Sequence, residues 1–68
     1  MIPGEARIGD IYVYDGVEWE VEGFHRQPVV LLRRRDVPVH TALCERTHAA
    51  IDPTSHWAAE WERKGQRA

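Results

Sequence analysis

The chain has 68 residues, of which 43% are hydrophobic and 29% charged, and its net charge at neutral pH is −2. This composition excludes an intrinsically disordered chain, which combines low hydrophobicity with high net charge, and provides no overall electrostatic attraction to nucleic acid. The single cysteine excludes an internal disulfide framework, and the longest apolar run, residues 29–32, is far shorter than the ~20 residues that span a membrane. We therefore expect one small cytoplasmic domain over residues 1–68, without a membrane partner.

The first predicted element is a β-hairpin that turns at Asp15-Gly16. Residues 11–14 are all β-branched or aromatic, and residues 17–22 alternate between apolar and acidic. An Asp-Gly pair between two such runs is a strong hairpin signal. Before the hairpin, residues 1–7 read as a short leader that lacks the pattern of a signal peptide.

The length of the hairpin loop decides which face of the sheet carries the tyrosines. A two-residue loop pairs Tyr12 with Trp19 and places the tyrosines in the core. A three-residue loop that starts at Tyr14 pairs Ile11 with Trp19 instead, and both tyrosines then lie on the outer face beside the glutamates. We favour the three-residue loop because it gathers the aliphatic residues of both strands on one face.

Three further extended segments are predicted after the hairpin. Residues 28–35 form an apolar run with a cationic end, which is typical of a strand that leaves the core. Weaker signals predict a strand over residues 39–44 and a short strand over residues 49–51. Residues 41–46 contain good helix formers and could instead begin a short helix, so the structure of residues 40–51 is left open.

A C-terminal helix is predicted over residues 53–64. Asp52 is a typical N-cap and Pro53 suits the first helical position. Trp57 and Trp61 are four residues apart and would share one helix face. Since so short a helix is not stable alone, we expect this face to cover the core. An exposed tryptophan pair would instead anchor a binding partner.

These elements indicate a mainly β (α+β) fold, with residues 8–51 as a small barrel or curled antiparallel sheet. The run GDIYVYDGVEWEV, residues 9–21, resembles the opening hairpin of SH3-like small β-barrels of the Tudor and KOW kind. The resemblance covers residues 8–35. It implies a barrel that binds proline-rich or methylated peptides, nucleic acids or protein partners. No aromatic cage for methylated side chains and no KOW glycine signature is identifiable in the sequence.

The candidate binding residues are an aromatic and cationic set on neighbouring strands. They are Tyr12, Tyr14, Arg26, Arg33, Arg34 and Arg35. A nucleic acid would contact the arginines of residues 33–35 through its phosphates, with the tyrosines or Phe24 available to stack on bases. The competing interpretation is that the arginines pair across strands with an acidic row, which holds the register. That row consists of Glu18, Glu20 and Glu22.

Several zinc-ligand residue types follow one another at a spacing of four. They are His40, Cys44 and His48, with His56 further along. On a strand, four residues span about 13 Å, and on a helix the outer two histidines lie about 12 Å apart, so at most one pair and a distant third residue could share an ion. Cys44 near histidines also suggests a nucleophile, but the sequence indicates neither an orienting partner nor an anion-stabilising site. We expect no metal, no cofactor and no enzymatic activity.

The sequence thus favours a non-enzymatic small binding module that engages a protein partner through the aromatic and cationic strand face. A nucleic-acid-binding barrel that uses residues 33–35 is the alternative, and a zinc-binding module through Cys44 is less favoured. The brevity of the chain is typical of an accessory protein, such as one encoded by a phage. The oligomeric state is left open.

Overall fold

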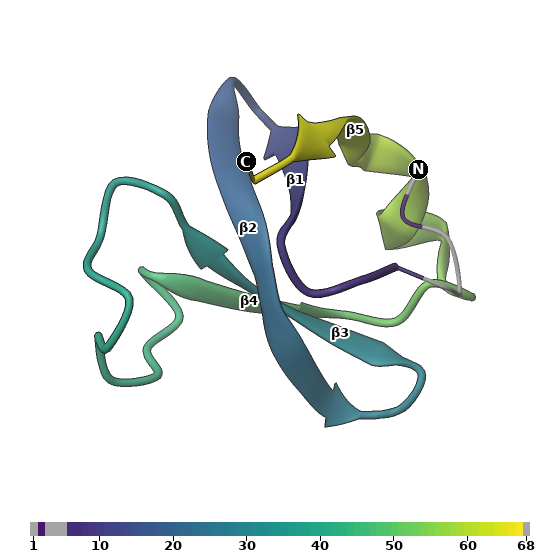
Figure 1. Ribbon diagram of the computed structural model, residues 1–68. Coiled ribbons are helices and arrows are strands. Elements are labelled where there is room, and N and C mark those ends of the chain that lie inside the picture. The colour runs from purple at the N-terminus through teal and green to yellow at the C-terminus, as the bar shows by residue number, and fades with distance from the viewer. Residues whose placement is uncertain (1, 3–5, 68) are drawn as a thin grey trace.

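The computed structural model describes residue 2 and residues 6–67, and its main feature is a five-stranded antiparallel sheet. The strands are β1 (Asp10–Tyr14), β2 (Val17–Arg26), β3 (Val29–Arg34), β4 (His48–Ile51) and β5 (Glu62–Gln66). A 3-10 helix, η1 (His56–Glu60), connects β4 to β5. The strand order is β4-β3-β2-β1-β5 (Figure 1). The expectation of a mainly β, antiparallel fold is therefore confirmed.

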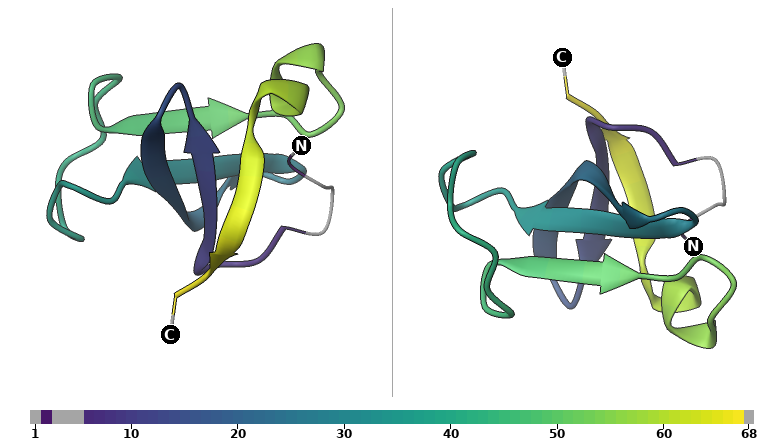
Figure 2. Two further views of the ribbon diagram at one scale, coloured as in Figure 1. Left: turned by 90° about the horizontal axis from the view of Figure 1, so that it is seen from above. Right: turned by 90° about the horizontal axis from the view of Figure 1, so that it is seen from below.

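The sheet is strongly curled but does not close. Figure 2 shows β1 and β5 running across β3 and β4, and the long strand β2 takes part in both halves. The pairing of β2 with β3 shifts register between Val21 and Gly23 and again between Phe24 and Arg26. Such bulges bend a strand and increase its twist. Because β4 and β5 do not pair, they remain the two edges of the sheet.

The hairpin between β1 and β2 has a two-residue loop, so the prediction of a three-residue loop is wrong. Tyr14 pairs with Val17 and Tyr12 pairs with Trp19. Asp15 and Gly16 both have positive φ, 51° and 76°, which is the backbone geometry of the tightest hairpin turns. Tyr12 consequently points into the core.

The core lies on the concave face of the sheet and continues into η1. Its fully buried side chains include Tyr12, Val21, Val30 and Leu32, which come from β1, β2 and β3. Ala58 of η1 is buried with them, and its carbonyl oxygen accepts a hydrogen bond from the backbone N–H of Ile2. Ile2 and Ala6 are also buried. Residues 1 and 3–5 of the leader predicted over residues 1–7 lie outside the described residues.

The predicted C-terminal helix over residues 53–64 is wrong, because only one short 3-10 helix forms there. The backbone becomes extended at Trp61 (φ −97°, ψ 130°), and the following residues pair with β1. As a strand, this segment forms backbone hydrogen bonds to β1. These bonds are more favourable than a short helix, which is only marginally stable. None of the helices in the described part of the chain is long and apolar enough to cross a membrane.

Of the two weak strand predictions, the one at residues 49–51 is confirmed by β4, whereas residues 39–44 form a loop. Local turns hold this loop. The backbone N–H of Thr41 donates to Pro38, and the carbonyl oxygen of Cys44 accepts from the N–H groups of both Thr47 and His48. These bonds satisfy the backbone without a neighbouring strand.

Candidate functional site: an aromatic groove beside the 3-10 helix

All three tryptophans of the chain line one groove of about 320 Å³. Trp19 lies on β2, whereas Trp57 belongs to η1 and Trp61 directly follows it. Tyr14, at the end of β1, adds a fourth aromatic side chain, and Ile51 of β4 contributes an aliphatic one. In Figure 2 the coil of η1 lies beyond the end of β4, close to β5. Residues that are distant in the sequence thus form one aromatic surface, which we call the aromatic groove.

Trp61 is the fixed centre of the aromatic groove. Its ring stacks on Tyr14, with centroids 4.8 Å apart and planes inclined by 17°, and it meets the ring of Trp19 edge-on at 5.4 Å. Both arrangements are favourable for aromatic pairs. Trp61 is only 3% exposed, whereas Trp57 is 57% exposed. The groove therefore has a rigid base and a prominent indole at its rim.

Two carboxylates, those of Glu45 and Glu60, also line the aromatic groove. Both residues are exposed, and neither carboxylate makes a hydrogen bond or an ion pair with any other described residue. His48, which also lines the groove, is bonded at Nε2 to Glu22 (3.1 Å) and at Nδ1 to Thr47 (2.8 Å). The groove is thus aromatic with unneutralised acids at its edge.

The structure does not bring the predicted binding residues together on one surface. Tyr12 is fully buried, and this burial, helped by the charge of Asp10, raises the pKa of its hydroxyl. Tyr14 is 37% exposed and belongs to the aromatic groove. Arg33 pairs with Glu20 across the strands and so lies on the opposite face of the sheet from Tyr12. The placement of Tyr12 at the surface is therefore wrong.

The arginines of residues 33–35 are engaged in ion pairs. Arg33, itself only 5% exposed, contacts Glu22 at 3.4 Å. Arg35 contacts Glu18 at 3.1 Å, and Arg34 contacts Asp36 at 2.8 Å. Cross-strand pairing of Arg33 and Arg35 with the acidic row is thus confirmed. Arg26 is exposed at the end of β2, and nucleic-acid binding stays a prediction.

The acidic row of β2 forms an ion-pair ladder on the convex face of the sheet. Glu18 also pairs with Lys64 of β5, Glu20 with Arg67, and Glu22 with His48 of β4. The pKa of Glu18 is lowered, first by the hydrogen bond from Lys64 and then by that from Arg35. The ladder therefore connects both edges of the sheet to its central strand.

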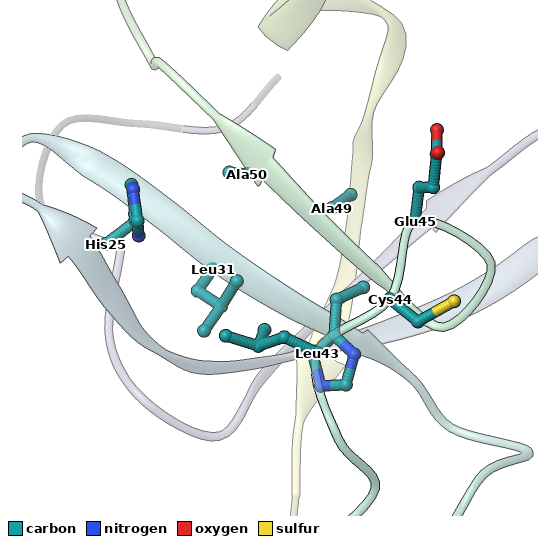
Figure 3. A pocket seen from close by; sticks show the side chains of 8 residues that line it. His25, Leu31, Leu43, Cys44, Glu45, Ala49 and Ala50 are labelled. Carbon is teal, nitrogen blue, oxygen red and sulfur yellow. The ribbon is translucent and has the colours of Figure 1, made fainter.

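The zinc-ligand residue types do not form a metal site in the described part of the chain, where no three His, Cys, Asp or Glu side chains lie close enough to share an ion. Cys44 is exposed and lines a second hollow, also of about 320 Å³, together with His25, Leu31 and Leu43. Figure 3 shows the Glu45 side chain extending away from His25 and Leu31 in this hollow. The sulfur of Cys44 makes no hydrogen bond to a described histidine.

The aromatic groove could not be read from the sequence as a site. Its only local signal was the pair Trp57 and Trp61, together with the argument that an exposed tryptophan pair would anchor a partner. Trp19 joins them only through the curl of the sheet. No protein family, curated protein or solved structure compared with the chain matches it. The candidate site therefore rests on its geometry.

Proposed function

We propose that the protein is a non-enzymatic binding module that holds an extended segment of a protein partner in the aromatic groove. The observation that carries this proposal is the convergence of all three tryptophans and Tyr14 on one groove. Tryptophan and tyrosine dominate the energetics of protein interfaces because they offer large, rigid contact areas. As in the sequence analysis, the proposed partner is a protein, but the proposed binding surface is now the aromatic groove instead of the aromatic and cationic strand face.

A proline-rich segment in the polyproline II conformation fits the aromatic groove best. Such a segment is already extended before it binds, so that little conformational entropy is lost, and its rings pack well against aromatic side chains. The ring of Tyr14, which stacks on the buried Trp61, offers an aromatic surface of this kind. Trp57 stands beside them, exposed and ready to cover one side of a ligand.

We also infer that the sheet is a member of the SH3-like small barrels. Two features support this: β5 pairs with β1 although the two lie near opposite ends of the chain, and a 3-10 helix leads into β5. The inference agrees with the resemblance of residues 9–21 to the opening hairpin of such barrels. A cytoplasmic location and an accessory role, including one in a phage, stay predictions.

Replacing Trp57 by alanine tests the proposed function. An array of proline-rich ten-residue peptides, followed by titration of the peptides retained, gives the affinity. We expect Trp57→Ala to weaken binding about tenfold or more, as the loss of an interface anchor does. Its thermal stability should stay within about 0.5 kcal/mol of the original chain, since Trp57 is largely exposed.

The matched control is Phe24→Ala, which removes an exposed aromatic side chain outside the groove. This variant should bind the peptides as the original chain does. The proposal is contradicted if no peptide of the array is retained, or if Trp57→Ala and Phe24→Ala bind equally well.

A further inference from the structure

The two edge strands of the sheet, β4 and β5, differ in how well they are protected against pairing with another chain. We propose that β4 pairs with β4 of a second copy of this chain. The two strands run antiparallel and are related by a two-fold axis at Ala50, so that the two sheets become one continuous sheet. This interface goes beyond the proposed function and does not depend on it.

The contrast between β4 and β5 carries the first part of the argument. The exposed side chains of β5 include Glu62, Arg63 and Lys64, and the pairing of β5 with β1 shifts register between Ile11 and Tyr12. Charged side chains and bulges are usual means by which a sheet edge avoids further pairing. In contrast, β4 has the sequence HAAI and pairs with β3 without a register shift. One edge of the sheet is therefore protected, whereas the other is regular and carries no Lys, Arg, Asp or Glu.

The backbone groups of Ala50 point away from the sheet and are available to a second strand. The N–H of Arg34 donates to the carbonyl oxygen of Thr47, and regular antiparallel pairing continues from there, with Leu32 opposite Ala49. Successive residues of a strand direct their N–H and C=O groups to opposite sides. Thr47 and Ala49 therefore bond to β3, whereas the N–H and C=O of Ala50 face outward. The small, exposed side chain of Ala50 lets two copies approach closely and exchange both hydrogen bonds at this position.

The charges at the two ends of β4 favour a second copy in the antiparallel direction. Arg46 lies shortly before β4 and Asp52 directly after it, and neither side chain makes an ion pair with another described residue. Hydrogen bonds from Thr54 lower the pKa of Asp52, so that its carboxylate is charged at neutral pH. In an antiparallel two-fold pair the start of one strand lies beside the end of the other, which brings Arg46 of each copy toward Asp52 of the second copy. A parallel pair would instead place like charges together.

An apolar hollow beside β4 supplies contact area that the short strand alone lacks. A specific interface buries about 1,200 Å² or more in total, which one pair of four-residue strands does not provide. Leu31, Leu43 and Ala50 line the hollow of about 320 Å³, and Leu43 is 67% exposed (Figure 3). The two-fold axis of an antiparallel pair is perpendicular to the sheet, so the hollows of both copies lie on the same face, next to the axis. The second copy therefore covers apolar surface that a single copy exposes to water.

Sedimentation equilibrium of the full chain at a series of concentrations tests the inference. We expect a reversible equilibrium between monomer and dimer. Ala50→Lys places two like charges face to face at the axis and should raise the dissociation constant of the dimer at least tenfold. The matched control is Gln66→Lys, which adds the same charge to an exposed residue of β5 and should dimerise as the original chain does. Circular dichroism verifies that both variants are folded, which we expect because both side chains are exposed.

Reversing the charge of Arg46 tests the direction of the pairing. Arg46→Glu brings a second carboxylate toward Asp52 of the other copy and should weaken the dimer about tenfold at low salt, with a smaller effect at high salt. The control is Arg7→Glu, which makes the same change at an exposed arginine before β1 that has no described ion-pair partner. This control should leave the dimer unchanged.

Three results would overturn the inference. The first is a chain that stays monomeric up to a concentration of about 1 mM, the range of weak association, which would leave β4 free for a strand of a different protein. The second is a dimer that Ala50→Lys and Gln66→Lys affect equally. The third is a dimer that Ala50→Lys weakens while Arg46→Glu does not, because the two strands then do not pair in the antiparallel arrangement.

Discussion

Tyr12 is the largest fully buried side chain of the described core, and no described residue hydrogen-bonds to its hydroxyl. A buried hydroxyl without a partner destabilises the folded state, because it loses its hydrogen bonds to water. The ring itself contributes favourably, since it is packed among Val21, Leu32 and the other core residues. Tyr12 is therefore a core residue whose ring stabilises the fold and whose hydroxyl group destabilises it.

Replacing Tyr12 by phenylalanine should thus leave the stability at pH 7 unchanged or raise it by up to about 1 kcal/mol. The difference should grow above pH ~10, where tyrosine ionises in the unfolded chain. Because the pKa of Tyr12 is raised in the folded chain, its hydroxyl stays protonated there while the hydroxyl in the unfolded chain ionises. The original chain therefore loses stability as the pH rises toward the raised pKa. The variant has no hydroxyl at this position and does not show this loss. Urea unfolding at pH 7 and at pH 10.5 measures both effects.

A clearly lower urea midpoint for Tyr12→Phe at pH 7 would contradict this account, because it would mean that the hydroxyl has a stabilising partner. Equal alkaline losses in the two proteins would show that Tyr12 does not carry the effect.

At the scale of elements, the ion-pair ladder couples strands that are distant in the sequence. Glu18 of β2 contacts Arg35 after β3 and Lys64 of β5. Since these side chains are partly exposed to solvent, each pair contributes little by itself. Their effect is to favour one register, because opposite charges face each other only in the observed pairing.

The ladder should make the stability depend on acid pH through Glu18. Its lowered pKa means that its contribution is present above the ordinary pKa of a glutamate, about 4.3, and is lost as the pH falls through the lower pKa of the folded state. Glu18→Gln should therefore lose less stability than the original chain between pH 7 and pH 3. Melting temperatures at both pH values provide the measurement.

The control for this prediction is Glu62→Gln, whose carboxylate has no described ion-pair partner and whose loss should leave the acid dependence as it is. Identical pH profiles for Glu18→Gln and the original chain would argue against a role of the Glu18 pairs in stability.

The elements also show what the sequence could predict. The position of the hairpin followed from Asp15-Gly16, but its register did not, because Ile11 and Val13 on one face and Tyr12 and Tyr14 on the other are both suited to a core. The spacing of Trp57 and Trp61 fits an α-helix as well as a short 3-10 helix followed by a strand. Only the distant strand β1, which accepts β5 as a neighbour, decides between the two.

At the scale of the whole molecule, the core is small and each buried side chain matters. A domain of this size buries only about 60% of the surface that its unfolded chain exposes, so its stability is modest. Leu32→Ala removes a fully buried side chain and should cost about 2–5 kcal/mol, enough to unfold much of the protein. Circular dichroism during urea titration measures this loss.

Leu43→Ala is the matched control, because it makes the same chemical change at a side chain that is 67% exposed. Its effect should stay within about 0.5 kcal/mol. Similar losses for the two variants would mean that the core does not lie where the structure places it.

The pairing of β5 with β1 also affects how fast the protein folds. Val13 faces Glu62 and Asp10 faces Gln66, so this contact joins residues separated by most of the chain. Sheets with such distant contacts fold in milliseconds to seconds, much more slowly than helical proteins. Tyr14 is the last residue of β1 and Trp61 directly precedes β5, so their stacking depends on this pairing. The aromatic groove is therefore complete only after β5 has paired with β1.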